Sequence, residues 1–227
     1  MEAYSHFPRT LSDLLGHERQ KEYFKKLLSN GNLSHAYCFS GLSGIGKLSM
    51  ARAVARQLMC GESKESLIKF DSCNHPDYLE IFKDGNSIKT EQVEALHNFM
   101  HIKPYISEYK VVIIDDSHLM TEAAQNKMLK ILEEPPGHAL FVFVTDRPFK
   151  LLPTIRSRLV MITFQPLSTE DMLQVAQRLN MPVNNKLLLS SLGSMARYKK
   201  WSEDSFYPEF IDTLTRGLKA LCLGKNA

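Results

Sequence analysis

The stretch GLSGIGKL at residues 41–48 decides the fold, because it matches the phosphate-binding loop pattern G-x-x-x-x-G-K. Glycines in this pattern let successive backbone N–H groups turn inward around phosphate oxygens, and the lysine reaches the terminal phosphates. The next position normally carries a Ser or Thr hydroxyl that ligates Mg²⁺, and Leu48 has no such group. The loop is expected to bind ATP without efficient hydrolysis, and Mg²⁺ only together with the nucleotide. The predicted nucleotide contacts within the loop are Gly41, Gly44, Ile45, Gly46 and Lys47.

The residues on either side of this loop predict a strand before it and a helix after it. His35 to Ser40 is a short apolar run typical of a buried strand. Lys47 to Cys60 places its apolar residues three or four apart, which is typical of one helix face. A strand, a glycine loop and a helix N-terminus together form an anion site, because the positive end of the helix dipole faces the phosphates. A plain glycine-rich turn is the alternative interpretation.

Composition and length narrow the class of protein. The 227 residues are 44% hydrophobic and 23% charged, which is typical of a globular protein with one medium and one smaller domain. No apolar run approaches the ~20 residues of a membrane span, and the N-terminus lacks the apolar core of a signal peptide. Four cysteines form no recognisable disulfide framework. These features predict a cytoplasmic protein that does not contact membranes.

Strand and helix patterns alternate along the first part of the chain. Five strands separated by helices predict an α/β fold, with a five-stranded, mainly parallel P-loop sheet that is covered by helices on both sides. A small helical region follows, because composition changes near residue 165 and no strand pattern occurs beyond it. We expect a P-loop domain at 1–165, a small helical lid domain at 166–205 and a C-terminal helix at 206–227. Strands are expected at 35–40, 78–82, 110–115, 140–145 and 160–164, and helices at 11–28, 47–60, 90–100, 121–133 and 151–157.

Polar residues at strand ends predict further contacts with the nucleotide. Asp115 ends a buried strand, where P-loop hydrolases place the carboxylate that holds Mg²⁺. Asp116 stands where a Glu normally positions the attacking water, and it is one methylene shorter; the alternative is a helix N-cap. Thr145 ends the next strand and is either a sensor of the terminal phosphate or a turn residue. Arg158 is a candidate arginine finger for a neighbouring subunit, although cations at helix ends are also favoured without any function.

Six further segments carry a family resemblance: LLGHE at 14–18, SHAY at 34–37, HPD at 75–77, KVVIID at 110–115, AQNKMLKILEEPP at 124–136 and LLPTIRSR at 151–158. With the phosphate-binding loop, they make the chain resemble the delta-prime subunits of the bacterial DNA polymerase III clamp loader. These are AAA+ proteins related to the tau/gamma subunits. The resemblance extends over roughly residues 7–192.

The resemblance implies a role in DNA replication as part of a DNA-directed DNA polymerase holoenzyme. Subunits of this family use ATP to open the sliding clamp and place it on primed DNA, so the implied partners are tau/gamma and delta subunits, and through them the clamp and DNA. It implies a stator with little ATP hydrolysis of its own, which presents Ser157 and Arg158 to the ATP site of an adjacent tau/gamma subunit. Leu159 stands where the family usually has Cys.

Two departures from the family pattern affect the expected cofactors and length. Relatives have four cysteines between the P-loop helix and the HPD segment, whereas this chain has Cys60 and Cys73. With His75 these make at most three of the four ligands of a closed zinc site, so we expect two reduced thiols in a loop and no zinc. Relatives also carry a C-terminal helical collar, for which this chain has room only for the start. A naturally short subunit and a fragment both remain open.

Two other functions remain as alternatives. The first is an active tau/gamma-like AAA+ ATPase subunit that holds its metal with Asp115 and water alone. The second is an independent DNA-binding module. Its support is weak, because the basic residues Lys21, Lys25 and Lys26 on the first expected helix are of the kind that usually form a solvated face.

Overall fold

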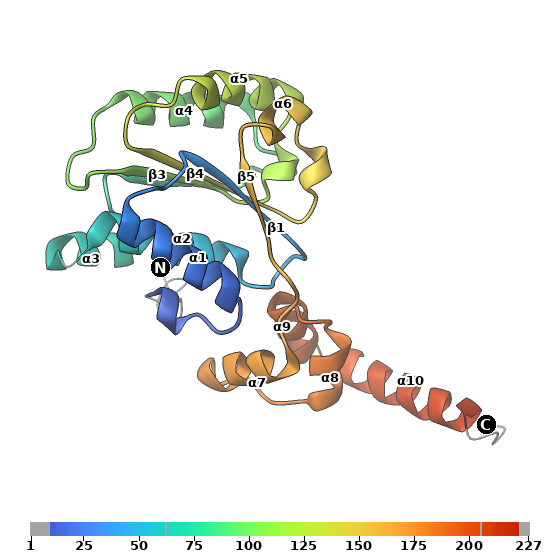
Figure 1. Cartoon of the computed structure of the whole chain (residues 1–227). Coiled ribbons are helices and arrows are strands. Elements are labelled where there is room, and N and C mark those ends of the chain that lie inside the picture. The colour runs from blue at the N-terminus through green and yellow to red at the C-terminus, as the bar shows by residue number, and fades with distance from the viewer. Residues whose placement is uncertain (1–9, 62, 205, 223–227) are drawn as a thin grey trace. The chain divides into compact units, whose positions relative to one another are not determined.

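The computed structural model describes residues 10–61, 63–204 and 206–222. These described residues divide by internal contacts into two compact units, one of the residues up to 42 and 46–164, the other of residues 43–45 and those from 165 on. The first unit is an α/β unit and the second is helical (Figure 1). None of the helices within the described residues is long and apolar enough to cross a membrane.

A five-stranded sheet lies at the centre of the first unit, with the order β2-β3-β4-β1-β5. Every neighbouring pair is parallel, which confirms the predicted fold class. β1, β3 and β4 are buried along their whole length, as expected of parallel strands covered on both sides. The strands are β1 (Ala36–Ser40), β2 (Tyr78–Ile81), β3 (Lys110–Ile114), β4 (Ala139–Thr145) and β5 (Val160–Thr163).

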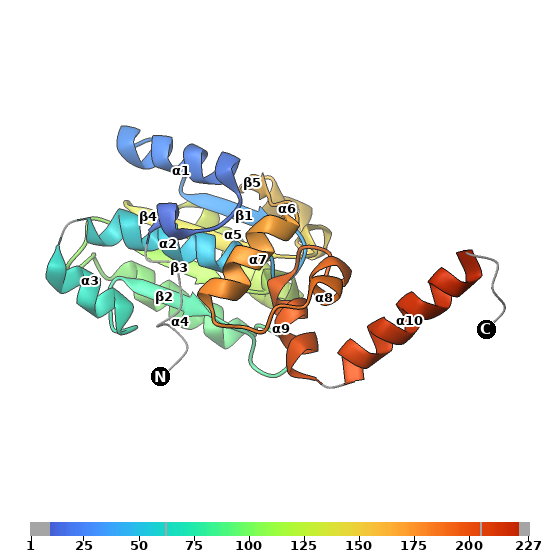
Figure 2. The ribbon, with the colours of Figure 1, turned by 90° about the horizontal axis from the view of Figure 1, so that it is seen from below.

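Helices cover both faces of this sheet (Figure 1). One face carries α4 (Thr90–His101), α5 (Glu122–Glu133) and α6 (Pro153–Arg156), and the other carries α1 (Glu18–Asn30), α2 (Lys47–Cys60) and α3 (Lys64–Asp71). Figure 2 shows the second group from its own side. The α4–α5 layer closes a core in which Leu96 and Met128 pack with Phe141 and Phe143 of β4. Short 3-10 turns lie at η1 (Leu11–Asp13), η2 (Ser117–Leu119) and η3 (Pro148–Lys150).

The single helix expected at residues 11–28 is wrong. The chain forms η1, then a short link at residues 14–17, and α1 begins only at Glu18. Gly16 and His17 have φ values of 72° and 59°, in the left-handed region, so the helix cannot run through them. The expectation that Lys21 belongs to a solvated face is also wrong. Lys21 is 6% exposed, and its Nζ donates to the backbone oxygen of Leu14 at 2.8 Å.

The segment between α2 and β2 was expected to be a loop, but it contains α3. Ser63 caps this helix, and Arg56 clamps its last residue, Asp71, with two hydrogen bonds of 2.8 and 3.0 Å. Cys60 is buried and Cys73 is exposed, while Nε2 of His75 lies 2.9 Å from a serine hydroxyl of α3. Among the described residues, no group of three or more His, Cys, Asp or Glu side chains could hold a metal ion.

Asp77 fixes the segment that leads into β3. Its side chain is buried, and it accepts backbone N–H bonds from Tyr105, Ile106 and Ser107 at 2.7, 2.7 and 3.0 Å. Burial alone would raise the pKa of Asp77, but these hydrogen bonds favour the carboxylate and the pKa lies below its ordinary value. The ionised form of Asp77 therefore stabilises the folded protein.

We expect Asp77→Asn to lower the free energy of unfolding by about 1.5–3 kcal/mol at neutral pH, because an amide cannot accept from all three donors. The folded pKa is lower than the unfolded one, so this stabilisation is complete above the unfolded pKa and is lost as pH falls through the folded value. Urea unfolding should show the gap between wild type and variant narrowing below about pH 4. An equal gap at pH 7 and pH 3 would contradict this origin.

The second unit contains α7 (Thr169–Arg178), α8 (Asn185–Ser190), α9 (Met195–Glu203) and α10 (Phe206–Cys222). Tyr198 is fully buried at the centre of α7–α9 and donates from its hydroxyl to the backbone oxygen of Pro182 at 2.5 Å. α10 packs against this group through a stacked Trp201–Tyr207 pair. Residues 223–227 of the expected C-terminal helix lie outside the described residues.

Candidate nucleotide-binding site

The phosphate-binding loop connects β1 to α2. Gly41, Gly44 and Gly46 have φ values of 147°, 76° and 101°, a region that side-chain-bearing residues rarely adopt. Gly46 precedes the first turn of α2 and has no side chain to cap it, so the first backbone N–H groups of the helix are not capped by a side chain. A glycine-bounded turn that ends at a helix N-terminus fits a phosphate group.

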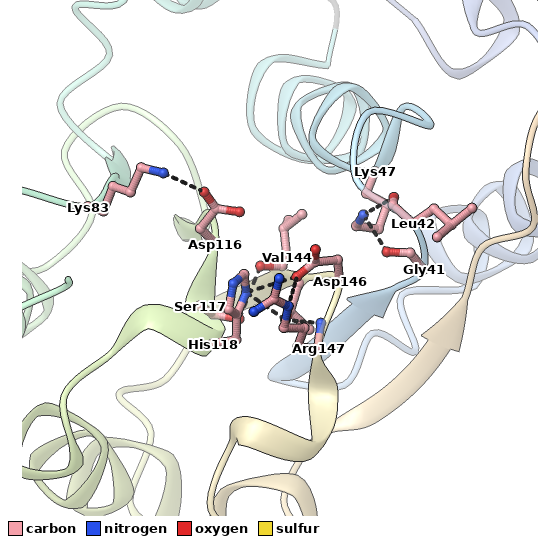
Figure 3. A network of polar contacts seen from close by, with 11 residues as sticks. Gly41, Leu42, Lys47, Lys83, Asp116, Ser117, His118, Val144, Asp146 and Arg147 are labelled. Carbon is pink, nitrogen blue, oxygen red and sulfur yellow. Dashed lines mark hydrogen bonds and ion pairs between the residues drawn. The ribbon is translucent and has the colours of Figure 1, made fainter. Parts of the chain in front are cut away.

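Lys47 is turned toward the loop that precedes it (Figure 3). Its ammonium group donates to the backbone oxygens of Gly41 and Leu42 at 2.8 and 2.5 Å, and the residue is 5% exposed. Burial lowers the pKa of Lys47, and the nearby carboxylates of Asp146 and Asp115 oppose that shift. The lysine is thus in place beside the loop, and its hydrogen bonds are made to the loop itself.

The two aspartates after β3 have different surroundings. Burial raises the pKa of Asp115, and the neighbouring charge of Asp116 adds to this, while the cations of Arg52 and Lys47 oppose it. Asp116 occupies the N-cap position of η2, as one interpretation predicted, but its φ is a left-handed 47° and its side chain makes no capping hydrogen bond. Its carboxylate instead lies 3.5 Å from Nζ of Lys83 (Figure 3).

Thr145, at the end of β4, belongs to a polar cluster that sequence reasoning did not find in full. Its hydroxyl accepts a hydrogen bond from the backbone N–H of Arg147 at 3.0 Å and lies 3.1 Å from Nδ1 of His118. The same nitrogen lies 3.3 Å from Oδ1 of Asp146 (Figure 3). Burial lowers the pKa of His118, so the imidazole is neutral near pH 7. The only sequence signal for His118 was its place three residues after Asp115.

The donor set around the loop fits a phosphate better than it fits a metal. The glycines, the start of α2 and Lys47 together suit anionic oxygens. Leu48 lies in the first turn of α2 and offers no oxygen where the hydroxyl ligand of Mg²⁺ normally stands. Asp115, directly after β3, is the carboxylate that could hold a nucleotide-bound Mg²⁺, and burial raises the pKa of its side chain.

Ser157 and Arg158 follow α6, and their side chains contact α5 and α6 rather than the phosphate-binding loop. The guanidinium of Arg158 donates from Nη2 to Oε1 of Glu133 and from Nη1 to the backbone oxygen of Thr154, both at 2.7 Å. Ser157 Oγ donates to the same Thr154 oxygen at 3.0 Å. The Arg158 side chain nevertheless remains 35% exposed. Sequence reasoning had singled out this arginine but not its partner Glu133.

Residues 16–168 match the family model described as "DNA polymerase III, delta subunit". The chain belongs to this family. The matched range contains the phosphate-binding loop, Asp115, Thr145 and Arg158, so all the candidate residues lie within the family domain.

Curated relatives and solved structures agree with this membership. The delta' subunit of DNA polymerase III from Bacillus subtilis is 39% identical over 153 residues, which is 63% of this chain and 46% of the relative. A DNA polymerase III gamma/tau subunit from Mycobacterium tuberculosis is 37% identical over 160 residues, 66% of this chain and 28% of the relative. The chain therefore spans between about a quarter and a half of the length of these relatives.

Two solved structures from Thermotoga maritima share the fold. A gamma subunit-related protein of DNA polymerase III superposes with a TM-score of 0.50 at 26% identity, covering 78% of this chain and 57% of that protein. The RuvB Holliday junction branch migration motor superposes with a TM-score of 0.61, covering 87% of this chain and 64% of that protein. At 15% identity the second likeness concerns the fold alone.

Proposed function

We propose that this chain is a delta-prime-like subunit of a bacterial DNA polymerase III clamp loader, which helps place the sliding clamp on primed DNA during replication. It acts as a stator that turns over little ATP itself and supplies Arg158 to the ATP site of a neighbouring tau/gamma subunit. Its direct partners are tau/gamma and delta subunits, and it meets the clamp and primed DNA through the complex. Family membership and the delta' relative support this assignment.

The observation that carries the stator role is the residue after Lys47. Leu48 supplies no hydroxyl to a Mg²⁺ ion that would bridge the β- and γ-phosphates, so metal binding depends mainly on Asp115. Asp116 is shorter than the usual Glu, and its carboxylate is 3.5 Å from Lys83. A site with these groups is suited to hold a nucleotide and is badly equipped to activate water.

The exposure of Arg158 supports the second half of the role. An arginine finger must donate to phosphate oxygens bound by another subunit, so part of its guanidinium must reach the surface. About a third of the Arg158 side chain is accessible although it contacts Glu133, which is compatible with this requirement.

We expect the purified chain to turn over ATP at a rate close to the uncatalysed background, and Lys47→Ala to leave that rate unchanged. The reason is the missing metal ligand, which prevents charge stabilisation even when nucleotide is bound. The measurement is steady-state phosphate release by the isolated chain, with nucleotide affinity followed separately by calorimetry. Steady turnover that Lys47→Ala abolishes would refute the stator role.

The second candidate function is an active tau/gamma-like ATPase subunit. The similarity to gamma/tau relatives and the presence of Lys47 and Asp115 favour it. The variant Leu48→Thr distinguishes the two functions. In a site that already hydrolyses ATP without this hydroxyl, restoring it should change the rate of ATP turnover little. A dormant site is expected instead to gain turnover. Leu42→Thr serves as a matched control, since Leu42 also lies in the loop but its side chain is exposed.

A further inference from the structure

Arg158 is held by acceptors from two different helices. Glu133 is the last residue of α5, and its carboxylate receives Nη2 of Arg158 at 2.7 Å. The backbone oxygen of Thr154, in α6, receives Nη1 at 2.7 Å, and the hydroxyl of Ser157 lies 3.5 Å from the same nitrogen. The guanidinium is therefore fixed at both terminal nitrogens, so the long side chain has few rotamers left.

The stability of helix α5 does not explain why a glutamate stands at position 133. A negative charge at a helix C-terminus faces the negative end of the dipole, and Glu134 adds a second negative charge beside it. Among the described residues, Glu133 forms an ion pair with Arg158, while the Glu134 side chain makes none. An exposed pair of this kind contributes little to folding stability. The pair nevertheless places the carboxylate of Glu133 directly against the guanidinium of Arg158.

The hydrogen bonds to Glu133 and Thr154 leave part of the guanidinium available. Arginine has five N–H donors, and the contacts above engage only Nη1 and Nη2. Among the described residues, Nε of Arg158 has no hydrogen-bond acceptor. The remaining donors and the 35% exposure of the side chain allow contact with a phosphate while Glu133 still holds the other end of the group.

We propose that Glu133 is a positioning residue that sets Arg158 in advance for the phosphates of a neighbouring subunit's nucleotide. This inference rests on the proposed function, in which Arg158 acts in trans. Fixing the arginine before the nucleotide arrives removes the entropy cost of ordering it in the transition state. Glu133 itself touches no reacting atom, and its contribution passes entirely through Arg158.

The test is a double-mutant cycle in the reconstituted complex of this chain with its tau/gamma and delta partners. We expect Glu133→Ala to lower the kcat of clamp- and DNA-stimulated ATP turnover at the served site by about 3–10-fold, with the KM for ATP unchanged. In the Arg158→Ala background the same change should have no further effect. Glu133→Gln keeps an acceptor oxygen in place and should recover part of the loss. Glu134→Ala is the matched control and should leave the rate unchanged.

Each outcome separates the two proposals. If Arg158→Ala lowers turnover but Glu133→Ala does not, or raises it, the finger stands and the positioning role of Glu133 is overturned. A loss from Glu133→Ala that persists at equal size in the Arg158→Ala background indicates a purely structural effect and also overturns it. If Arg158→Ala itself leaves turnover unchanged, the proposed function fails and the positioning role fails with it. Urea unfolding and gel filtration of each variant check that folding and assembly are retained.

Discussion

Replacing Arg158 by alanine should nearly abolish ATP turnover at the one site that this chain serves in a clamp-loader complex. Arginine fingers are worth ~10³–10⁵ in rate, because they neutralise charge that develops on the transferred phosphoryl group. A complex with several ATP sites should lose only the share of ATP hydrolysis that comes from this one site. Single-turnover kinetics can resolve that share. Nucleotide binding should persist, since binding does not need the finger.

Two further variants sharpen this prediction. Arg158→Lys keeps the positive charge and loses the planar fork, so it should recover only a small part of the rate. Arg156→Ala removes a guanidinium two residues away, which lies 5.4 Å from the ring of Phe149, and should stay near the wild-type rate. If a complex with Arg158→Ala assembles normally and keeps ATP turnover at every site, Arg158 does not act on a neighbouring subunit's ATP.

Arg52→Ala should be the most damaging substitution for the stability of the α/β unit. Arg52, on α2, donates from Nε and Nη2 to the two carboxylate oxygens of Glu80 on β2, at 2.7 and 2.6 Å. Both side chains are below 10% exposure, and the hydroxyl of Tyr78 also donates to Glu80. Arg52→Ala takes both guanidinium donors from a buried carboxylate, and breaking a buried ion pair in this way costs about 3–5 kcal/mol.

The measurement is chemical unfolding followed by far-ultraviolet circular dichroism, with Arg52→Ala, Glu80→Gln and the double variant compared. We expect the double variant to be much less destabilised than the sum of the two single variants, because each single variant leaves one buried charge behind and the double variant leaves none. Arg56→Ala is a useful control, since its pair with Asp71 is more exposed and should cost far less. A loss below about 1 kcal/mol for Arg52→Ala would show that water reaches the pair and screens it.

Local sequence patterns were enough for the phosphate-binding loop and its sheet. The glycine spacing, the apolar run before it and the three-to-four spacing after it lie within about 30 residues and specify backbone conformation directly. The helix predicted at 47–60 and its observed bounds, Lys47–Cys60, coincide for this reason. The ends of the predicted strands indicated Asp115 and Thr145 as candidates, and the family resemblance strengthened the candidacy of Arg158, although their roles stay proposals.

The break before α1 could not be predicted in the same way. His17 carries a side chain, yet its φ is 59°, and its ring packs edge-on against Phe164 with 4.9 Å between centroids. That partner lies at the other end of the unit in sequence. The locally unfavourable backbone conformation of His17 thus occurs together with a contact to Phe164, which is distant in sequence. Local sequence patterns do not contain such a contact and could not predict it.

The sequence by itself determined the parallel P-loop sheet, the glycine loop and the absent hydroxyl at Leu48, because each depends on residue type at short range. Only the tertiary structure decided how the polar and charged groups are paired: Lys47 with backbone oxygens of its own loop, His118 beside Thr145, and Glu133 with Arg158. The last two pairs join residues that are distant in sequence, and the distances between their polar atoms are fixed by how the elements of the unit pack together. Charge pairing acts through those distances and through burial, neither of which is written in residue order.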